Sequence, residues 1–230
     1  LFRDIDKRGG IIESVKSGYI QDLISESRNR MEKEVASRKI PILGTNQYPN
    51  LTETMAEKIR LHEVWEKEQD TTYQTIPGFR ASEAFEKVRL ATEKYVSEGN
   101  KRPMVFLFTI GNLAMRRARA GFATNFFGCA GYGILDNNGF SSVDEGIKAA
   151  FDSEAPIVVI CSSDEEYPEL APEITMKLKS KKPRIKVVLA GYPKDIAEEL
   201  KSAGVDAFIH VRSNLLDDLE YFQHQIGVKM

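Results

Sequence analysis

The sequence has few cysteines, no long apolar run and almost no excess of charge. Its two cysteines, Cys129 and Cys161, are too few for a disulfide framework and lack the paired spacing of a zinc site, so we expect both to be small buried residues. No uninterrupted apolar stretch approaches the roughly 20 residues that cross a bilayer. A formal net charge of −2 gives no general attraction to phosphate backbones or anionic lipid, which argues against nucleic acids and membranes as partners.

What is present is typical of a soluble globular protein. The 230 residues are 42% hydrophobic and 29% charged, enough for one domain of ordinary size with an extension, or for two small domains. The sequence begins at Leu1 and not at a methionine, so we expect a fragment of a longer chain.

The first segment, residues 1–39, is predicted to be helical. The stretch Ile11–Lys39, "IIESVKSGYIQDLISESRNRMEKEVASRK", carries apolar residues at helical spacing and becomes strongly charged toward its end. Such a helix is expected to bury its apolar stripe against a neighbour.

The second segment, residues 40–100, is predicted to be a linker that contains one helix. Ile40–Pro49, "IPILGTNQYP", indicates an extended piece and not a core strand, because it combines a glycine with two prolines. The next thirty-odd residues, which include the stretch Glu63–Phe79, have little periodicity and are typical of a linker lying along a surface. A helix follows over residues 80–99, with Ser82 as the expected N-cap and Gly99 at its end.

The third segment, residues 101–230, alternates regularly between strands and helices. Continuously apolar runs such as "IVVIC" are typical of parallel strands covered on both faces. Strands are expected at Met104–Thr109, Gly133–Asp136, Ile157–Cys161, Lys186–Ala190 and Ala207–Val211, with helices beginning near Asn112, Val143, Pro168, Pro193 and Asn214. The pattern predicts an α/β fold, a doubly wound, five-stranded parallel sheet of the flavodoxin-like kind.

Ligands of such folds bind beyond the carboxyl ends of the strands. A phosphorylated receiver domain requires acidic residues after the first strand, and Ile110 and Gly111 stand there instead. A flavin-mononucleotide domain requires a hydroxyl- and glycine-rich phosphate loop, of which Thr109, Gly111 and Asn112 are a thin version. Three arginines follow that could hold an anion, although this spacing is more often a solvated face or a partner contact: Arg116, Arg117 and Arg119.

Several phrases, in order along the whole chain, resemble the carboxyl-terminal part of methylmalonyl-CoA mutase, and specifically of its small, non-catalytic subunit. They are Gly9 and Gly10 followed by "IIESVKSGYIQDLI", then "ILGTNQYPN", "RASEAFEKVR", "ARAGFATNFFGCAG" and "LKSAGVDAFIHVRSN". The resemblance implies an amino-terminal β/α barrel that this chain lacks, then a linker, then a cobalamin-binding-type domain with a flavodoxin-like fold.

The resemblance also implies that the cobalamin site is degenerate. In the catalytic subunit of the family, D-x-H-x-x-G after the first strand supplies the cobalt-ligating His, an Asp that orients it and a Gly beside the nucleotide tail of the cofactor. Aligned on "ARAGFATNFF", this sequence has Asn112, Ala114 and Arg117 at those positions. An alanine cannot ligate a metal, and a bulky arginine would crowd the tail.

Two further cobalamin signatures are also altered. S-x-L after the third strand appears as Ser162, Ser163 and Asp164, with a charge where an apolar residue is expected. G-G after the fourth strand appears as Gly191 and Tyr192, with a ring where the tail needs space. We therefore expect no functional cofactor-binding, catalytic or metal-ligating residue in this chain.

The histidines do not change this expectation. His210 lies at the end of the fifth strand, and a lone histidine without a carboxylate partner is more often a partly buried, hydrogen-bonded residue than a ligand. His62 in the linker and His224 in the last helix form no metal-binding spacing.

By resemblance, the chain is expected to have a structural role in a cytoplasmic heterodimer with a homologous catalytic large subunit. That subunit would bind adenosylcobalamin and interconvert succinyl-CoA and (R)-methylmalonyl-CoA by radical rearrangement, chemistry that the cofactor supplies. Two alternatives remain open. One is a cobalamin carrier or sensor module, which Ala114 disfavours, and the other is a stand-alone nucleotide-binding enzyme on a flavodoxin-like scaffold, which the thin phosphate loop disfavours.

Overall fold

The computed structural model describes residues 1–54, 74–76 and 78–229 of the chain. Most of the predicted linker stretch Glu63–Phe79, and His62 with it, lies outside the described residues. Within the described part, no helix is long and apolar enough to span a membrane.

Five parallel strands form one sheet in the order β2-β1-β3-β4-β5, which is the flavodoxin-like order. The predicted fold class is thus confirmed. The strands are β1 (Met104–Thr109), β2 (Gly133–Leu135), β3 (Ile157–Cys161), β4 (Lys186–Ala190) and β5 (Ala207–Ile209). Only β2 and β5 end earlier than the sequence predicts. In the central register, Phe106 of β1 pairs with Leu135 of β2 and with Val158 of β3.

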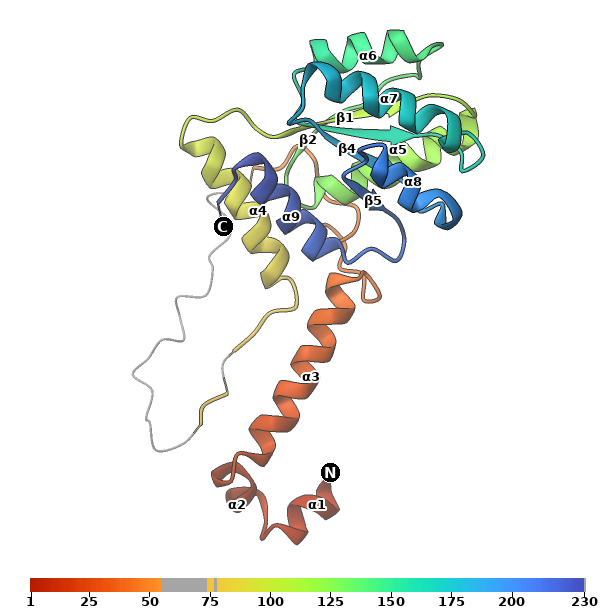
Figure 1. Cartoon of the computed structure of the whole chain (residues 1–230). Coiled ribbons are helices and arrows are strands. Elements are labelled where there is room, and N and C mark those ends of the chain that lie inside the picture. The colour runs from red at the N-terminus through yellow and green to blue at the C-terminus, as the bar shows by residue number, and fades with distance from the viewer. Residues whose placement is uncertain (55–73, 77, 230) are drawn as a thin grey trace.

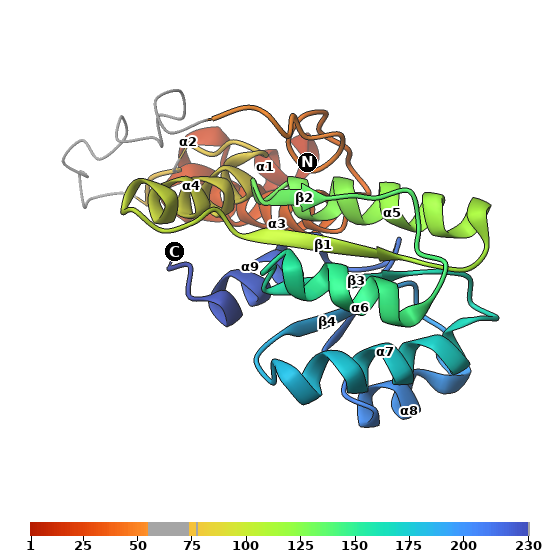
Figure 2. The same cartoon turned by 90° about the horizontal axis from the view of Figure 1, so that it is seen from above.

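Helices cover both faces of the sheet (Figure 2). One face carries α5 (Leu113–Gly128), α9 (Leu215–Ile226) and, beside α9, α4 (Glu83–Ser97). The other face carries α6 (Val143–Asp152), α7 (Tyr167–Lys181) and α8 (Ala197–Ser202), with the short 3₁₀ helix η1 (Lys194–Ile196) before α8. Each face has its own apolar core, with Phe127 and Phe222 in the first and Ile174 and Leu178 in the second. The two predicted buried thiols, Cys129 and Cys161, are buried and free.

The amino-terminal segment forms an arm, which we define as α1 (Phe2–Lys7), α2 (Ile11–Lys16) and α3 (Tyr19–Ala36). The arm extends away from the sheet, with α1 and α2 at its far end (Figure 1). The single helix predicted from residue 11 to 39 is wrong, because the chain turns at Gly18, which has a left-handed φ of +79°. Its apolar stripe also stays largely open within the described residues, since Ile12 is 65% and Ile24 41% exposed.

The carboxyl-terminal end of the arm is tied to the sheet domain. Val35 is buried in the core beneath α5 and α9, and the Arg38 guanidinium lies 4.8 Å from the centre of the Phe122 ring. The predicted extended piece after α3 is a compact turn with one isolated bridge and no named strand. Asn46, only 1% exposed, holds this turn by donating to the carbonyl oxygens of Val35 (2.8 Å) and Ile40 (3.0 Å).

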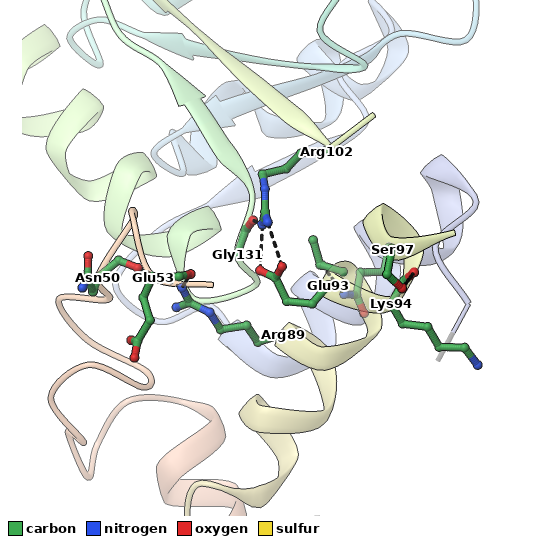
Figure 3. A network of polar contacts seen from close by, with 10 residues as sticks. Asn50, Glu53, Arg89, Glu93, Lys94, Ser97, Arg102 and Gly131 are labelled. Carbon is green, nitrogen blue, oxygen red and sulfur yellow. Dashed lines mark hydrogen bonds and ion pairs between the residues drawn. The ribbon is translucent and has the colours of Figure 1, made fainter. Parts of the chain in front are cut away.

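A polar network anchors α4 to the linker and to the turn before β2 (Figure 3). Arg89 donates to the carbonyl oxygens of Asn50 (2.9 Å) and Glu53 (2.8 Å). Arg102 forms a two-pronged ion pair with Glu93, each N–O distance being 2.8 Å, and also donates to the carbonyl oxygen of residue 131. The predicted N-cap of α4, Ser82, stands at the N-cap position, but its hydroxyl does not cap the helix. Because α4 contributes Phe85 and Val88 to the core, it is an integral layer of the sheet domain.

Candidate functional site

The carboxyl ends of the five strands meet at one edge of the sheet, which we call the carboxyl edge. It consists of residues 110–117, 136–139, 162–166, 191–192 and 210–214, and it contains every predicted site residue. In this topology a ligand would bind here, because the chain leaves β1 toward one face of the sheet and leaves the neighbouring β3 toward the other face.

The first predicted triplet lies at the start of α5. Asn112 is the N-cap of this helix, and its side-chain oxygen accepts a hydrogen bond from the backbone N–H of Met115 at 3.1 Å. Ala114 and Arg117 lie exposed within the first five residues of α5, so neither is drawn toward the interior of the sheet. The Asn112 side chain therefore caps its own helix, and the exposed methyl group of Ala114 offers no atom that could ligate a metal.

The second predicted position, Ser162, is fully buried after β3 and faces a carboxylate. Its hydroxyl donates to Glu166 Oε2 at 2.5 Å, and the hydroxyl of Ser163 donates to the same oxygen at 2.9 Å. The backbone N–H of Asn112 reaches both carboxylate oxygens, at 3.0 and 3.1 Å. These hydrogen bonds, led by that of Ser162, lower the pKa of Glu166 to about 2.

Asp164 and Gly191 lie together, and a third residue joins them. Arg119 of α5 extends to Asp164 after β3 and forms an ion pair of 3.0 Å. A Cβ added to Gly191 would meet the Arg119 guanidinium at 3.1 Å and Asp164 Oδ1 at 3.2 Å, so the ion pair lies directly over this glycine. Asp164 is thus a partnered carboxylate that bridges the space between α5 and the end of β4.

Arg116 closes the other side of α5. Its guanidinium donates to the carbonyl oxygens of Gly111 (3.1 Å) and Asn138 (3.0 Å), and a Cβ added to Gly139 would overlap it. Of the three arginines that could have held an anion, two therefore make internal contacts. Only Arg117 lies on the solvated face that the sequence pattern favours.

Tyr192, which follows β4, lies beside His210, which follows β5. The Tyr192 ring is 41% exposed and packs edge-on against Phe208, with 5.5 Å between ring centres, and 5.2 Å from His210. His210 is half-buried and its Nδ1 accepts the backbone N–H of Arg212 at 3.2 Å, as expected for a hydrogen-bonded histidine. Burial is the main cause that lowers the pKa of His210, and the nearby Arg212 and Arg38 lower it further.

The described polar side chains at this edge are engaged mainly in contacts within the chain. Among the described residues, no group of three or more His, Cys, Asp or Glu side chains could hold a metal ion. Cys161 is fully buried, which raises the pKa of its thiol and removes it as a nucleophile. A polar cavity of about 350 Å³ lies beside α5 and is lined by residues that include Thr109, Arg117 and Asn137.

The sequence analysis gave Glu166 no role and treated Arg119 only as one of three arginines that could hold an anion. The signal for Glu166 is the pair of serines three and four residues before it, a spacing that brings hydroxyls back to a carboxylate at a helix start. Arg119 gave no comparable signal, because its partner Asp164 is 45 residues away along the chain.

The whole sequence is similar to known proteins. The profile of the methylmalonyl-CoA mutase family matches residues 1–115. The methylmalonyl-CoA mutase small subunit of Porphyromonas gingivalis is 41% identical over 233 residues, which cover 100% of this chain and 36% of that protein. The small subunit of Streptomyces virginiae is 30% identical over 216 residues, covering 93% of this chain and 34% of the relative.

More distant relatives carry the same description. A probable methylmalonyl-CoA mutase small subunit of Mycobacterium tuberculosis is 27% identical over 229 residues, covering 98% of this chain and 34% of the relative. The chain thus spans about a third of the length of the curated relatives it matches.

Proposed function

This chain belongs to the methylmalonyl-CoA mutase family, and we propose that it is part of the small subunit of an adenosylcobalamin-dependent mutase, with a structural role and no catalytic residue of its own. The similarity to small subunits along the whole chain supports the subunit assignment. The enzyme would interconvert succinyl-CoA and (R)-methylmalonyl-CoA in the cytoplasm. A homologous large subunit would be the partner in a heterodimer.

The residues at the carboxyl edge do not fit cobalamin, and this misfit supports the proposal that the site is degenerate. Adenosylcobalamin would supply the radical chemistry when bound to the large subunit. In this chain, the turn before α5 offers Ala114 where an imidazole would be required. The single observation that carries the proposal is the Arg119–Asp164 pair over Gly191, because it occupies the space between α5 and the sheet with charged groups.

An absorbance titration with adenosylcobalamin tests the cofactor proposal. The chain alone is expected to leave the cobalamin spectrum unchanged, whereas a homologous large subunit is expected to shift it. A shift with this chain alone would revive the carrier or sensor alternative. Released flavin or nucleotide after denaturation of the purified chain would favour the stand-alone enzyme instead.

Co-expression tests the proposed partner. A tagged full-length small subunit that contains this chain is expected to retain an untagged large subunit through affinity and size-exclusion steps in a 1:1 ratio. Mutase activity should require the large subunit and should be undetectable with the small subunit alone. Activity of the small subunit by itself would contradict the structural role.

A further inference from the structure

The turn before α5 and the loop after β3 form a cradle of hydrogen-bond donors. The cradle consists of the backbone N–H groups of Asn112 and Ser163 and the hydroxyls of Ser162 and Ser163, which converge on the Glu166 carboxylate. Donors in this position of a flavodoxin-like sheet are suited to anions, because helix N-termini carry partial positive charge and unpaired N–H groups. Here the anion comes from the chain itself.

The turn at Gly111 packs tightly against the carboxylate. Gly111 has a left-handed φ of +79°, and a Cβ added to it would overlap the carboxylate of Glu166. Ser162 is fully buried and Ser163 is 4% exposed, so solvent has little access to their hydroxyls. In the described residues, Glu166 is the acceptor for both hydroxyls. Because buried donors require an acceptor, removal of this side chain would leave them unsatisfied.

We propose that Glu166 is a positioning residue that acts as a built-in anion. Its carboxylate occupies the donors that this edge of the sheet would offer to a free oxyanion, such as a carboxylate or phosphate group. It thereby fixes the Gly111–Asn112 turn against the loop after β3. Glu166 holds the turn in this way whether or not the chain binds cobalamin, so a cobalamin titration and a test of Glu166 can succeed or fail independently.

Two substitutions separate the charge of Glu166 from its volume. Glu166→Ala empties the cradle, while Glu166→Gln keeps the shape but turns an amide toward groups that are themselves donors. Glu165→Ala is the matched control, because it removes a carboxylate from the adjacent, exposed position. All three are made in this full chain, and amide hydrogen exchange is measured at Asn112 and Ser163.

Exchange at these two amides is expected to be at least about tenfold faster in Glu166→Ala, a factor that corresponds to about 1.4 kcal/mol. Glu166→Gln should change in the same direction, and Glu165→Ala should exchange like the wild type. If Glu166→Ala fails to fold, Glu166→Gln carries the test. Wild-type exchange at both amides in the folded Glu166 variants would overturn the proposal.

Rescue by a small anion distinguishes a built-in anion from a side chain that merely fills space. Sodium formate, compared with sodium chloride at equal ionic strength, is expected to raise the melting temperature of Glu166→Ala and to slow exchange at Asn112. The wild type and Glu165→Ala should not respond, because their cradles are already occupied. Equal responses of Glu166→Ala and Glu165→Ala to formate would show that the vacated cradle does not bind an anion, and would overturn the proposal.

Discussion

Restoring only the family's cobalamin motif is expected to leave this chain binding the cofactor more weakly than a variant in which the space behind the motif is opened as well. The perturbation is the triple variant Asn112→Asp, Ala114→His and Arg117→Gly, which returns the ligand, its orienting carboxylate and the glycine to the turn before α5. The reason is that a histidine in the turn before α5 is not sufficient when the space between α5 and the sheet is already filled. The Arg119 guanidinium and Asp164 would still lie over Gly191.

The size of this obstruction can be worked from the contacts. The Arg119 side chain is 22% and the Asp164 side chain 53% exposed, so their pair has the strength of a surface pair, about 0.2–1 kcal/mol. The edge-on packing of Tyr192 against Phe208 adds about 0.5–1.5 kcal/mol. Displacing both would cost about 0.7–2.5 kcal/mol, which weakens binding roughly 3- to 70-fold.

The second variant opens the space as well. It adds Arg119→Ala, Asp164→Leu and Tyr192→Gly to the triple variant. Arg119 and Asp164 must be removed together, because the buried Arg119 Nε already lacks a partner among the described residues and the guanidinium would otherwise lose its carboxylate. The matched control adds Lys201→Ala and Glu198→Leu to the triple variant, since this exposed pair of 2.8 Å lies on α8 across the sheet.

The assay is an absorbance titration with adenosylcobalamin, in which coordination by the new histidine shifts the cobalamin bands. At the lowest cobalamin concentrations that shift the bands of the opened variant, the triple variant and the control are expected to show little or no shift. Equal binding by the triple and the opened variant would mean that the Arg119–Asp164 pair does not obstruct the space, and the reasoning from Gly191 would be refuted.

Two further predictions concern stability. Gln223→Ala should lower the free energy of unfolding, measured in urea, by about 1–3 kcal/mol. The reason is that the buried amide donates to the Val88 carbonyl oxygen at 2.6 Å and so joins α9 to α4. The control, His224→Ala at the exposed neighbouring position, should change this free energy by less than about 0.5 kcal/mol. Burial raises the pKa of Asp218 from 3.8 to about 6, and a carboxyl group with a raised folded pKa loses stability as the pH rises through that value. Thermal unfolding should therefore show Asp218→Asn to be more stable than the wild type at pH 8, by about 1–2 kcal/mol after allowance for partial exposure. Below pH 4 the two proteins should have the same free energy of unfolding.

The strands were predictable because burial on both faces requires continuous apolar runs in the sequence. The run Ile157–Cys161 is completely buried and is bounded as the sequence predicts. The starts of α5, α6 and α9 carry capping side chains, as Asn214 shows by accepting the N–H of Asp217 at the start of α9. Both signals are local, so a single sequence contains them.

The prediction of one long helix after residue 11 was wrong for a physical reason. Periodicity continues through Gly18, but a left-handed backbone at that glycine redirects the chain between α2 and α3. The core role of α4 was also missed, because its partner Phe222 is more than a hundred residues away in sequence. Contacts of this range depend on topology and leave no periodic mark in either segment.

The same difference between local signals and long-range contacts limits what the sequence predicts about the carboxyl edge. A sequence shows that the motif positions hold Asn112, Ala114 and Arg117, but not what the neighbouring polar groups do instead. Every flavodoxin-like sheet presents N–H groups at this edge, and each one left unsatisfied in a buried position costs about 1–3 kcal/mol. In this chain Glu166 satisfies the donors between β1 and β3, while Arg119 spans the gap above Gly191. Buried donors at this edge require acceptors, and the Glu166 carboxylate supplies one from within the chain.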